Sequence, residues 1–332
     1  MPAPTDLMER LAAAVERGED VLPEAAEEPH EVPEPVPPGL FVAQPVPLGH
    51  GSLAAGGGDW FTHSVTGAPL LVVRGYDGAL RGFLNVCRHQ GGRVVAGEHG
   101  TGASGFRCTN HDWSYDTTGR LVGAPEPDDV DPTEGVGLYP VPVTERHGLV
   151  FALPSTAKVS LDAWLGSLDA DLAALDLGAC RVERLRERTR SVSWIDLASL
   201  LVDVPRLLGG QAPGPMVHEV VGPHQRFAVA PAGTAPEEVA ARAVRGLFLF
   251  PSTLVLARAG QASLVGAFRQ QGGLVGWRHE ILVRPGAPAD LAAGVTLEQR
   301  LFAVESERPS RTRSPGVRAL RGQVARAVVA LG

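Results

Sequence analysis

The chain has 332 residues, of which 44% are hydrophobic and 20% charged. The length predicts two domains, and the composition is that of a globular protein rather than a disordered or fibrous one. The formal net charge of −7 leaves no basic surplus for a nucleic-acid partner. No apolar run approaches the ~20 residues that a membrane helix requires, so no membrane partner is expected.

The first twenty residues are acidic and have no apolar stretch after a basic start, so no signal peptide is expected. The expected location is cytoplasmic. Three cysteines cannot all pair, and a reducing compartment argues against disulfides. Their expected use is therefore in a metal site, in catalysis or in the core.

Residues 1–40 are predicted to be an N-terminal helix followed by an extended arm. Apolar side chains recur at helical spacing over residues 5–19, where Gly18 ends the pattern. Residues 20–40 are acidic and rich in proline, which argues against both a helix and a paired strand.

Residues 41–155 are predicted to be an all-β domain. Two apolar runs, 70–73 and 80–86, flank a Gly-Tyr-Asp-Gly turn, which is a hairpin pattern. A last strand is predicted at 148–153, where Pro154 ends it.

Residues 156–332 are predicted to be an α+β domain, so the fold class of the whole chain is α+β. A linker helix is expected at 160–178. Consecutive strands with short turns then imply an antiparallel sheet, with strands at 216–221, 227–230, 247–250, 254–257, 263–268 and 274–283. Further helices are expected at 194–208, at 296–307 after a capping box, and from Ser314-Pro315 to 331.

The strongest chemical signal is a pair of short motifs, Cys87-Arg88-His89 and Cys108-Thr109-Asn110-His111, with eighteen residues between them. Zinc would take all four ligands as one tetrahedron. A two-iron cluster would take both cysteines on one iron and both histidines on the other. The mixed order differs from zinc fingers, which pair Cys with Cys and His with His. The motifs therefore favour the two-iron cluster, with zinc or incidental core cysteines as the alternatives.

The residues around these motifs resemble the Rieske domain of ring-hydroxylating oxygenase α subunits. The resemblance covers about residues 60–153. Besides the four candidate ligands it rests on Arg74, Asp77, Gly78, Leu80, Arg81, Phe83, Asn85, Gly91, Phe106, Trp113, Tyr115, Gly119, Leu121 and Pro125. It implies a Rieske-type [2Fe-2S] cluster in which Cys87 and Cys108 anchor the buried iron. His89 and His111 would hold the outer iron, where the electron leaves.

The sequence departs from the family pattern at residues next to the four candidate ligands. Gln90 stands where arginine is usual, and Thr109, Asn110 and Asp112 stand where proline, tyrosine and glycine are usual. The additional carboxylate of Asp112 is expected to favour the oxidised cluster and to lower its reduction potential.

The resemblance also implies a mononuclear iron in the second domain, held by two histidines and a carboxylate. With the spacing anchored on Trp194, Asp203 falls on the acid that bridges neighbouring subunits. Arg206 and Gln211 fall on the two histidine positions, and Glu305 falls on the carboxylate. Arginine has no free lone pair. The mononuclear Fe(II) is therefore expected to be lost, and an Arg206–Glu305 ion pair is expected in its place.

A shifted alignment would retain the iron. His218 and His224 lie on a predicted strand, with a spacing expected to put both on one face. Together with Glu305 they would form a rearranged site. The alternative is that both are surface or sheet-edge histidines.

Three functions follow from the resemblance. The first is an electron-transfer or accessory subunit of an oxygenase system, in a homo- or hetero-oligomer, a trimer or hexamer, beside a complete oxygenase subunit. The second is an active mono- or dioxygenase that hydroxylates or demethylates a small organic substrate. The third is a non-redox structural or binding descendant. No nucleotide-binding fingerprint is present, so a separate reductase or ferredoxin is expected to supply electrons.

Overall fold

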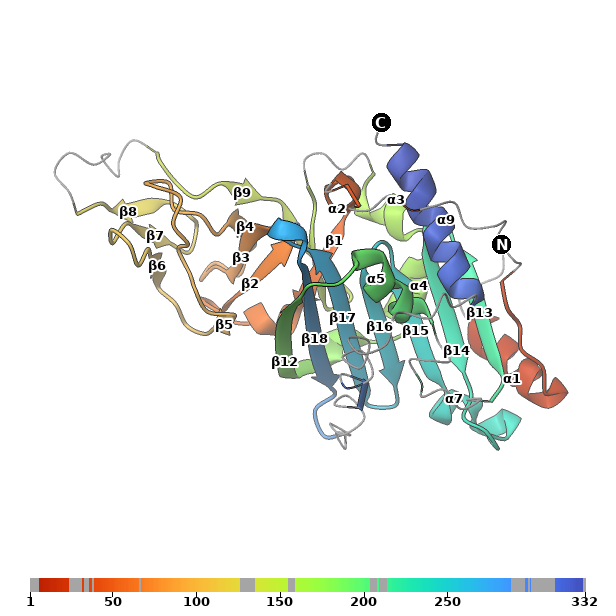
Figure 1. Cartoon of the computed structure of the whole chain (residues 1–332). Coiled ribbons are helices and arrows are strands. Elements are labelled where there is room, and N and C mark those ends of the chain that lie inside the picture. Colours follow the sequence, from red (N-terminus) through yellow and green to blue (C-terminus); the bar gives the residue numbers. More distant parts are fainter. Residues whose placement is uncertain are drawn as a thin grey trace. The chain divides into compact units, whose positions relative to one another are not determined.

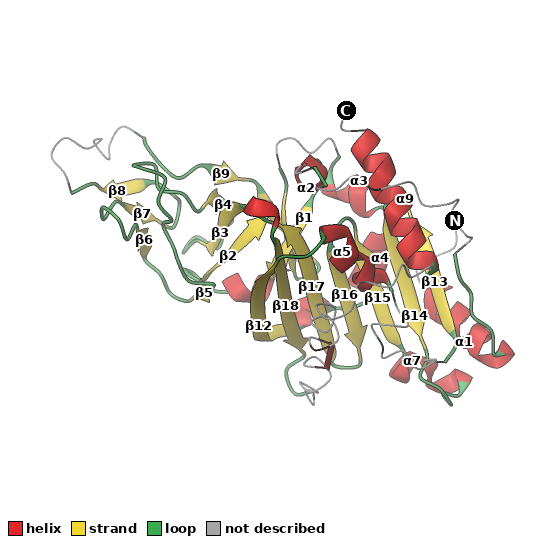
Figure 2. Ribbon diagram, in the orientation of Figure 1, coloured by secondary structure: helices red, strands yellow, loops and turns green. Residues whose placement is uncertain are grey.

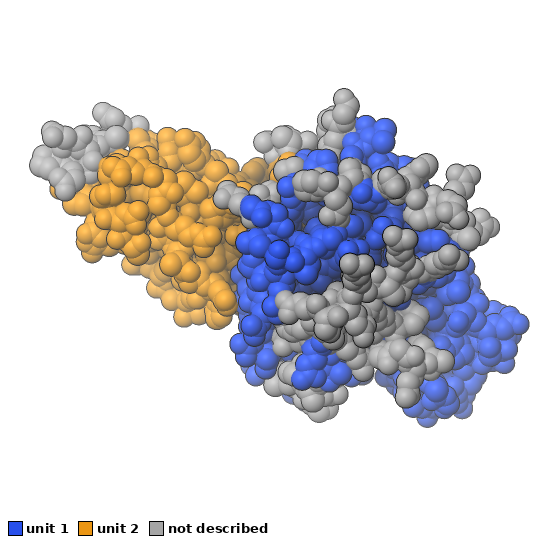
Figure 3. Space-filling view, in the orientation of Figure 1, with its two compact units in different colours: residues 1–41, 160–332 blue, residues 42–159 orange. Residues whose placement is uncertain are grey.

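The structure is a computed structural model that describes residues 6–23, 32, 36–37, 39–65, 67–125, 135–154, 159–203, 208, 214–287, 296–297, 299 and 314–330. The chain divides into two compact units (Figures 1 and 3). We call residues 42–159 the small-sheet unit, and residues 1–41 with 160–332 the large-sheet unit. The domain boundaries expected after residues 40 and 155 stay predictions. The predicted α+β class is confirmed.

The small-sheet unit consists of three antiparallel sheets of short strands, in the orders β1-β11-β10, β5-β2-β3-β4-β9 and β6-β7-β8. Its strands are β1 (Val46–His50), β2 (Trp60–Val65), β3 (Ala68–Arg74), β4 (Leu80–Leu84), β5 (His99–Gly100), β6 (Gly105–Arg107), β7 (Ser114–Asp116), β8 (Leu121–Gly123), β9 (Pro140–Val141), β10 (Val143–Arg146) and β11 (Leu149–Ala152). The short helix α2 (Gly39–Val42) precedes them.

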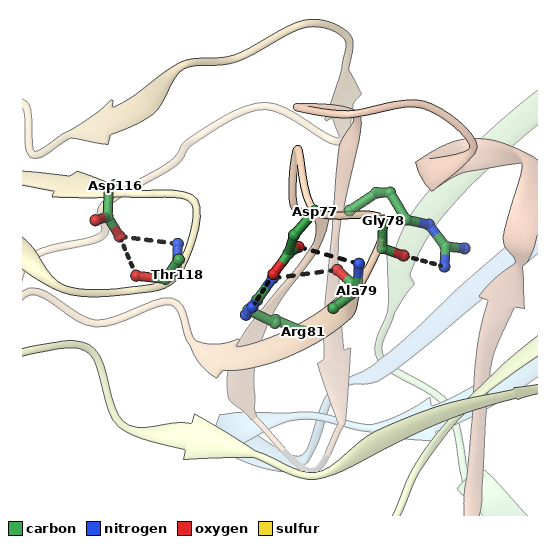
Figure 4. Close-up of polar contacts among 7 residues, drawn as sticks. Asp77, Gly78, Ala79, Arg81, Asp116 and Thr118 are labelled. Carbon is green, nitrogen blue, oxygen red and sulfur yellow. Dashed lines mark hydrogen bonds and ion pairs between the residues drawn. The ribbon is translucent and has the colours of Figure 1, made fainter.

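The predicted hairpin is formed by β3 and β4. The Asp77 carboxylate accepts from the Ala79 N–H at 3.1 Å and pairs with the Arg81 guanidinium at 2.6 Å (Figure 4). The bond from Arg81, followed by that from Ala79, holds the pKa of Asp77 well below its usual value. Asp116 caps the turn between β7 and β8 in a similar way, because its carboxylate accepts from the N–H and hydroxyl of Thr118 (Figure 4).

The large-sheet unit is built on one seven-stranded antiparallel sheet, in the order β12-β18-β17-β16-β15-β14-β13 (Figure 2). Its strands are β12 (Arg181–Arg190), β13 (Met216–Val221), β14 (His224–Val229), β15 (Val244–Leu249), β16 (Thr253–Arg258), β17 (Gln261–Arg269) and β18 (Val275–Val283). Its helices are α1 (Asp6–Arg17), α3 (Leu161–Leu165), α4 (Leu168–Ala173), α5 (Trp194–Val202), α7 (Val239–Arg242) and α9 (Pro315–Val329).

Successive side chains along each strand point to opposite faces of this sheet. Each face is covered by different helices. On one face α5 and α9 pack against each other, and a methyl group added at Gly316 of α9 would collide with His218. On the other face, Leu11 of α1 belongs to a buried cluster with Val217 and Ala228. Among the described residues, no helix is long and apolar enough to cross a membrane.

Several elements differ from the sequence expectation. The helix expected at 194–208 ends at Val202, where Asp203 is its C-cap. The strand β12 is not predicted because its sequence, RVERLRERTR, has no apolar alternation. It is one of the two edge strands of the sheet, and among the described strands it pairs with β18 alone. The single linker helix expected at 160–178 is two short helices, because Gly166 between them has a φ of +53°. Most of the helix expected at 296–307 lies outside the described residues.

A chain of alternating charges attaches α1 and α4 to the sheet. Arg226 on β14 is 6% exposed and donates to Asp171 of α4 at 2.8 Å and to Glu219 of β13 at 2.7 Å. Arg10 of α1 also pairs with Glu219. Burial raises the pKa of Asp171, and the bond from Arg226 opposes that rise. Arg226 is the shared cation of both carboxylates.

The helix α3 is held to the sheet by a buried histidine. His224, at 1% exposed, donates from Nε2 to the Trp164 carbonyl at 2.6 Å and accepts at Nδ1 from the Phe250 N–H at 3.1 Å. Both bonds require the neutral Nε2–H tautomer. Burial lowers the pKa of His224 to about 4, although the bond to Trp164 opposes the shift.

Replacing Arg226 by methionine is expected to destabilise the large-sheet unit by about 3 kcal/mol, because two buried carboxylates lose their cation. Urea unfolding followed by tryptophan fluorescence measures this loss. The control is Arg242→Met, since the Arg242–Glu238 pair is 44% and 50% exposed and its removal is expected to leave the midpoint unchanged. Equal midpoints for both variants would contradict the role of Arg226.

The free energy of unfolding is expected to fall as the pH decreases from ~6.5 to 4. The neutral form of His224 is favoured in the folded state, so the stabilisation is complete above the unfolded pKa and is lost towards the folded pKa of about 4. Between these two pKa values, the stabilisation that depends on neutral His224 amounts to roughly 3 kcal/mol. Unfolding at several pH values should give a shallower slope in His224→Gln, whereas His99→Gln, at an exposed site, should keep the wild-type slope. An unchanged slope in His224→Gln contradicts the prediction.

Candidate metal centre

Two loops of the small-sheet unit bring the four predicted ligands together. The first follows β4 and carries Cys87 and His89, and the second joins β6 to β7 and carries Cys108 and His111. The first loop is anchored by the buried Asn85. Its amide donates to the Val95 carbonyl at 2.7 Å and accepts from the Val95 N–H at 2.9 Å.

The two loops have the same backbone hydrogen bonds. In each, the cysteine N–H donates to the carbonyl five residues on, at 2.7 Å for Cys87 and 2.9 Å for Cys108. Each cysteine carbonyl accepts from the N–H four residues on, in Gly91 at 3.0 Å and in Asp112 at 3.1 Å. Gly91 and Asp112 both have a positive φ, +77° and +59°. The loops therefore present their cysteines in equivalent ways.

The thiols and the imidazoles differ in exposure. Cys87 and Cys108 are 3% and 1% exposed and belong to the core of the unit. His89 is half-buried and His111 is exposed. Their ring centroids lie 4.6 Å apart, and the ring of His89 stacks on Trp113 at 5.1 Å. The site thus has a thiol side in the core and an imidazole side at the surface.

Tyr115 contacts the first cysteine from the core. Its fully buried hydroxyl oxygen accepts from the Arg88 N–H at 3.0 Å and lies 3.3 Å from Cys87 Sγ. Burial, followed by the contact with Cys87, raises the pKa of Tyr115, so its hydroxyl proton is available to the sulfur. Sequence reasoning named Tyr115 without this role. The signal for it was the two-residue spacing from Trp113, which immediately precedes β7 and is buried on the same side of the chain as Tyr115.

This donor set fits a two-iron cluster better than a single metal ion. Among the described residues, no three His, Cys, Asp or Glu side chains converge to hold one ion. Zinc would require all four candidate ligands on one ion. A buried thiol pair beside an outward imidazole pair matches the split ligation of a Rieske centre.

In the large-sheet unit, the residues aligned with the mononuclear iron site are only partly described. Asp203 ends α5, is 4% exposed, and donates its N–H to the Leu200 carbonyl at 3.3 Å. Arg206, Gln211 and Glu305 lie outside the described residues, and so does the predicted Arg206–Glu305 ion pair.

The expectation that His218 and His224 share a face is wrong. They lie on two strands of a hairpin, in which His218 pairs with Phe227 and His224 with Val221. The turn between the strands reverses the alternation, so the two side chains point to opposite faces. They are not surface residues either, because they are 3% and 1% exposed. His218 bonds Gln225 at 2.9 Å, and His224 bonds the Trp164 carbonyl.

No two of the three described histidines in the large-sheet unit can ligate one iron. His279 is fully buried, bonds Ser263 at 3.0 Å and shares a face with His218. However, β18 and β13 are five strand spacings apart in the sheet, which is about 24 Å. His224 points to the face opposite both of them.

Comparison with known proteins agrees with the geometry of the small-sheet unit. The family described as "Rieske [2Fe-2S] domain" matches residues 46–140. Biphenyl 2,3-dioxygenase subunit alpha of Rhodococcus jostii is 36% identical over 122 residues, 36% of this chain and 26% of that protein. The glycine betaine monooxygenase oxygenase subunit of Chromohalobacter salexigens is 32% identical over 138 residues, 41% of this chain and 31% of that protein. The matched region therefore spans less than a third of these relatives.

Solved structures match over both units. The apo form of the quaternary ammonium Rieske monooxygenase CntA superimposes with a TM-score of 0.69 at 17% identity, covering 87% of this chain and 89% of that one. Naphthalene 1,2-dioxygenase from Rhodococcus sp. bound to indole gives a TM-score of 0.61 at 21% identity, covering 87% and 78%. Residues 46–140 are a Rieske [2Fe-2S] domain, and over 87% of its length the chain shares the fold of these two Rieske oxygenases.

Proposed function

We propose that this chain is a Rieske-type electron-transfer or accessory subunit of an oxygenase system. Cys87 and Cys108 hold one iron of the [2Fe-2S] cluster, and His89 and His111 hold the other. The observation that carries the proposal is a contrast between the units. All four candidate ligands lie on two equivalent loops, whereas no two of the described histidines of the large-sheet unit lie on the same face of neighbouring strands.

When bound, the cluster supplies a one-electron carrier. The chain's own residues set its surroundings. The buried thiols would be the anchor, and the Tyr115 hydroxyl, 3.3 Å from Cys87 Sγ, would donate to the metal-bound thiolate and disperse its charge. His89 and His111, at the surface side, would be the exit for the electron.

The assembly is part of the proposal. The relatives found by sequence are named as oxygenase subunits, which supports a homo- or hetero-oligomer, a trimer or hexamer, that includes a complete oxygenase subunit. Asp203 would bridge the cluster of one subunit to its neighbour. A separate reductase or ferredoxin would supply the electrons.

A second candidate is an active mono- or dioxygenase acting on a small organic substrate. It is favoured by the match of both units to CntA, whose name describes a quaternary ammonium monooxygenase. This candidate requires a third iron in the large-sheet unit, from ligands other than a pair among His218, His224 and His279. The non-redox alternative has no support from the complete Cys/His set.

The reduced protein is expected to give the low-average-g EPR signal of mixed Cys/His ligation. Replacing His111 by cysteine should change that spectrum or abolish cluster binding, because the outer iron loses an imidazole. His99→Cys, on an exposed strand of the same unit, is the matched control and should keep the wild-type spectrum. Purified protein that contains zinc and no acid-labile sulfide would refute the assignment.

Anaerobically purified protein is expected to contain two irons and two sulfides per chain. Cys87→Ser removes a cluster ligand, so the iron that remains in this variant reports any separate mononuclear site. The accessory-subunit proposal predicts no remaining iron, and the oxygenase candidate predicts one iron per chain. Elemental analysis of both proteins, with the chain concentration from amino-acid analysis, distinguishes the two functions.

A further inference from the structure

Two opposite charges close the second cluster loop. The Arg107 guanidinium lies 2.8 Å from the Asp112 carboxylate. Arg107 immediately precedes Cys108, and Asp112 immediately follows His111. The ion pair therefore joins the two ends of the segment that carries both candidate ligands of the second motif.

The backbone of this loop does not by itself require an aspartate. Asp112 has a φ of +59°, and the equivalent position in the first loop is Gly91. Glycine adopts this left-handed conformation without steric cost, and aspartate and asparagine tolerate it. The Asp112 N–H donates to the Cys108 carbonyl, and the Asp112 carbonyl accepts from the Ser114 hydroxyl at 3.0 Å. Residues without a carboxylate make these backbone bonds equally well, so the carboxylate itself is used in the pair with Arg107.

The Arg107–Asp112 pair can act on a charge held by the adjacent candidate ligands, Cys108 and His111. It contributes little to the stability of the fold. The two side chains are 68% and 51% exposed. An ion pair this exposed adds little to stability. A single charge at its position, however, interacts with a charge a few ångströms away even through water. A carboxylate next to His111 disfavours an added electron, and the adjacent guanidinium offsets that effect.

We infer that Arg107 and Asp112 are a charge-balancing pair that sets the reduction potential of the cluster. The inference rests on the proposed function, because it assumes the ligands assigned there. The additional carboxylate of Asp112, expected from the sequence to lower the potential, is therefore paired with a cation. Removing either member alone exposes the charge of the other, and the two changes move the potential in opposite directions.

The test is a redox titration of the full-length protein, monitored by circular dichroism at low ionic strength, in four forms: wild type, Asp112→Asn, Arg107→Gln and the double variant. Asp112→Asn is expected to raise the potential and Arg107→Gln to lower it. Each changes the reduction equilibrium constant by about threefold, or about 30 mV at ~59 mV per tenfold change. The double variant should return close to wild type. In 1 M salt both shifts should shrink.

The matched control is the Asp77–Arg81 pair, at the opposite end of β4 from Cys87 (Figure 4). Asp77→Asn and Arg81→Gln make the same charge changes and should leave the potential unchanged. Shifts of equal size in the control pair would reveal an effect of net charge only. Shifts of one sign, or none, in the Arg107 and Asp112 variants would also overturn the inference.

Iron, sulfide and the EPR spectrum are recorded on every form before titration. A wild-type protein without the cluster refutes the proposed function and the inference together. Intact spectra with equal potentials refute the inference alone.

Discussion

Burial of two thiols beside two outward imidazoles is the constraint around which the small-sheet unit is organised. The cysteines belong to the same buried cluster as Phe83 of β4 and Tyr115 of β7, so these two strands also fix the thiols. The loops then have to turn sharply to bring the imidazoles to the surface. Their shared hydrogen bonds and positive φ values meet that requirement at Gly91 and Asp112.

In the large-sheet unit the controlling constraint is the alternation of side chains across an antiparallel sheet. It places His218 and His224 on opposite faces, although only five residues separate them. It places His279 on the face of His218 but at a distant strand. Each imidazole is bonded in the interior, so these histidines contribute to packing between the sheet and its helices.

The sequence was sufficient for the fold class and for placing the four ligand candidates on two loops, because both depend on local patterns. Apolar runs and turns located β13 to β18, and the two Cys/His motifs lie on short loops next to strands. Features that depend on contacts between segments distant in the sequence could not be predicted from it. The face of His224 depended on a hairpin register, and β12, whose charged sequence has no apolar alternation, depended on pairing with β18. The bond from Tyr115 to Cys87 and the pair of Arg107 with Asp112 required distances between side chains.

The outermost strand of the large sheet has a consequence for how copies of the chain associate. Five of the ten residues of β12 are arginine and two are glutamate, so a second β12 laid alongside would bring surplus positive charge against positive charge. Like charges on paired strands repel, and charged edge strands resist the addition of another strand. Growth of the sheet from one copy into the next is therefore disfavoured at this edge.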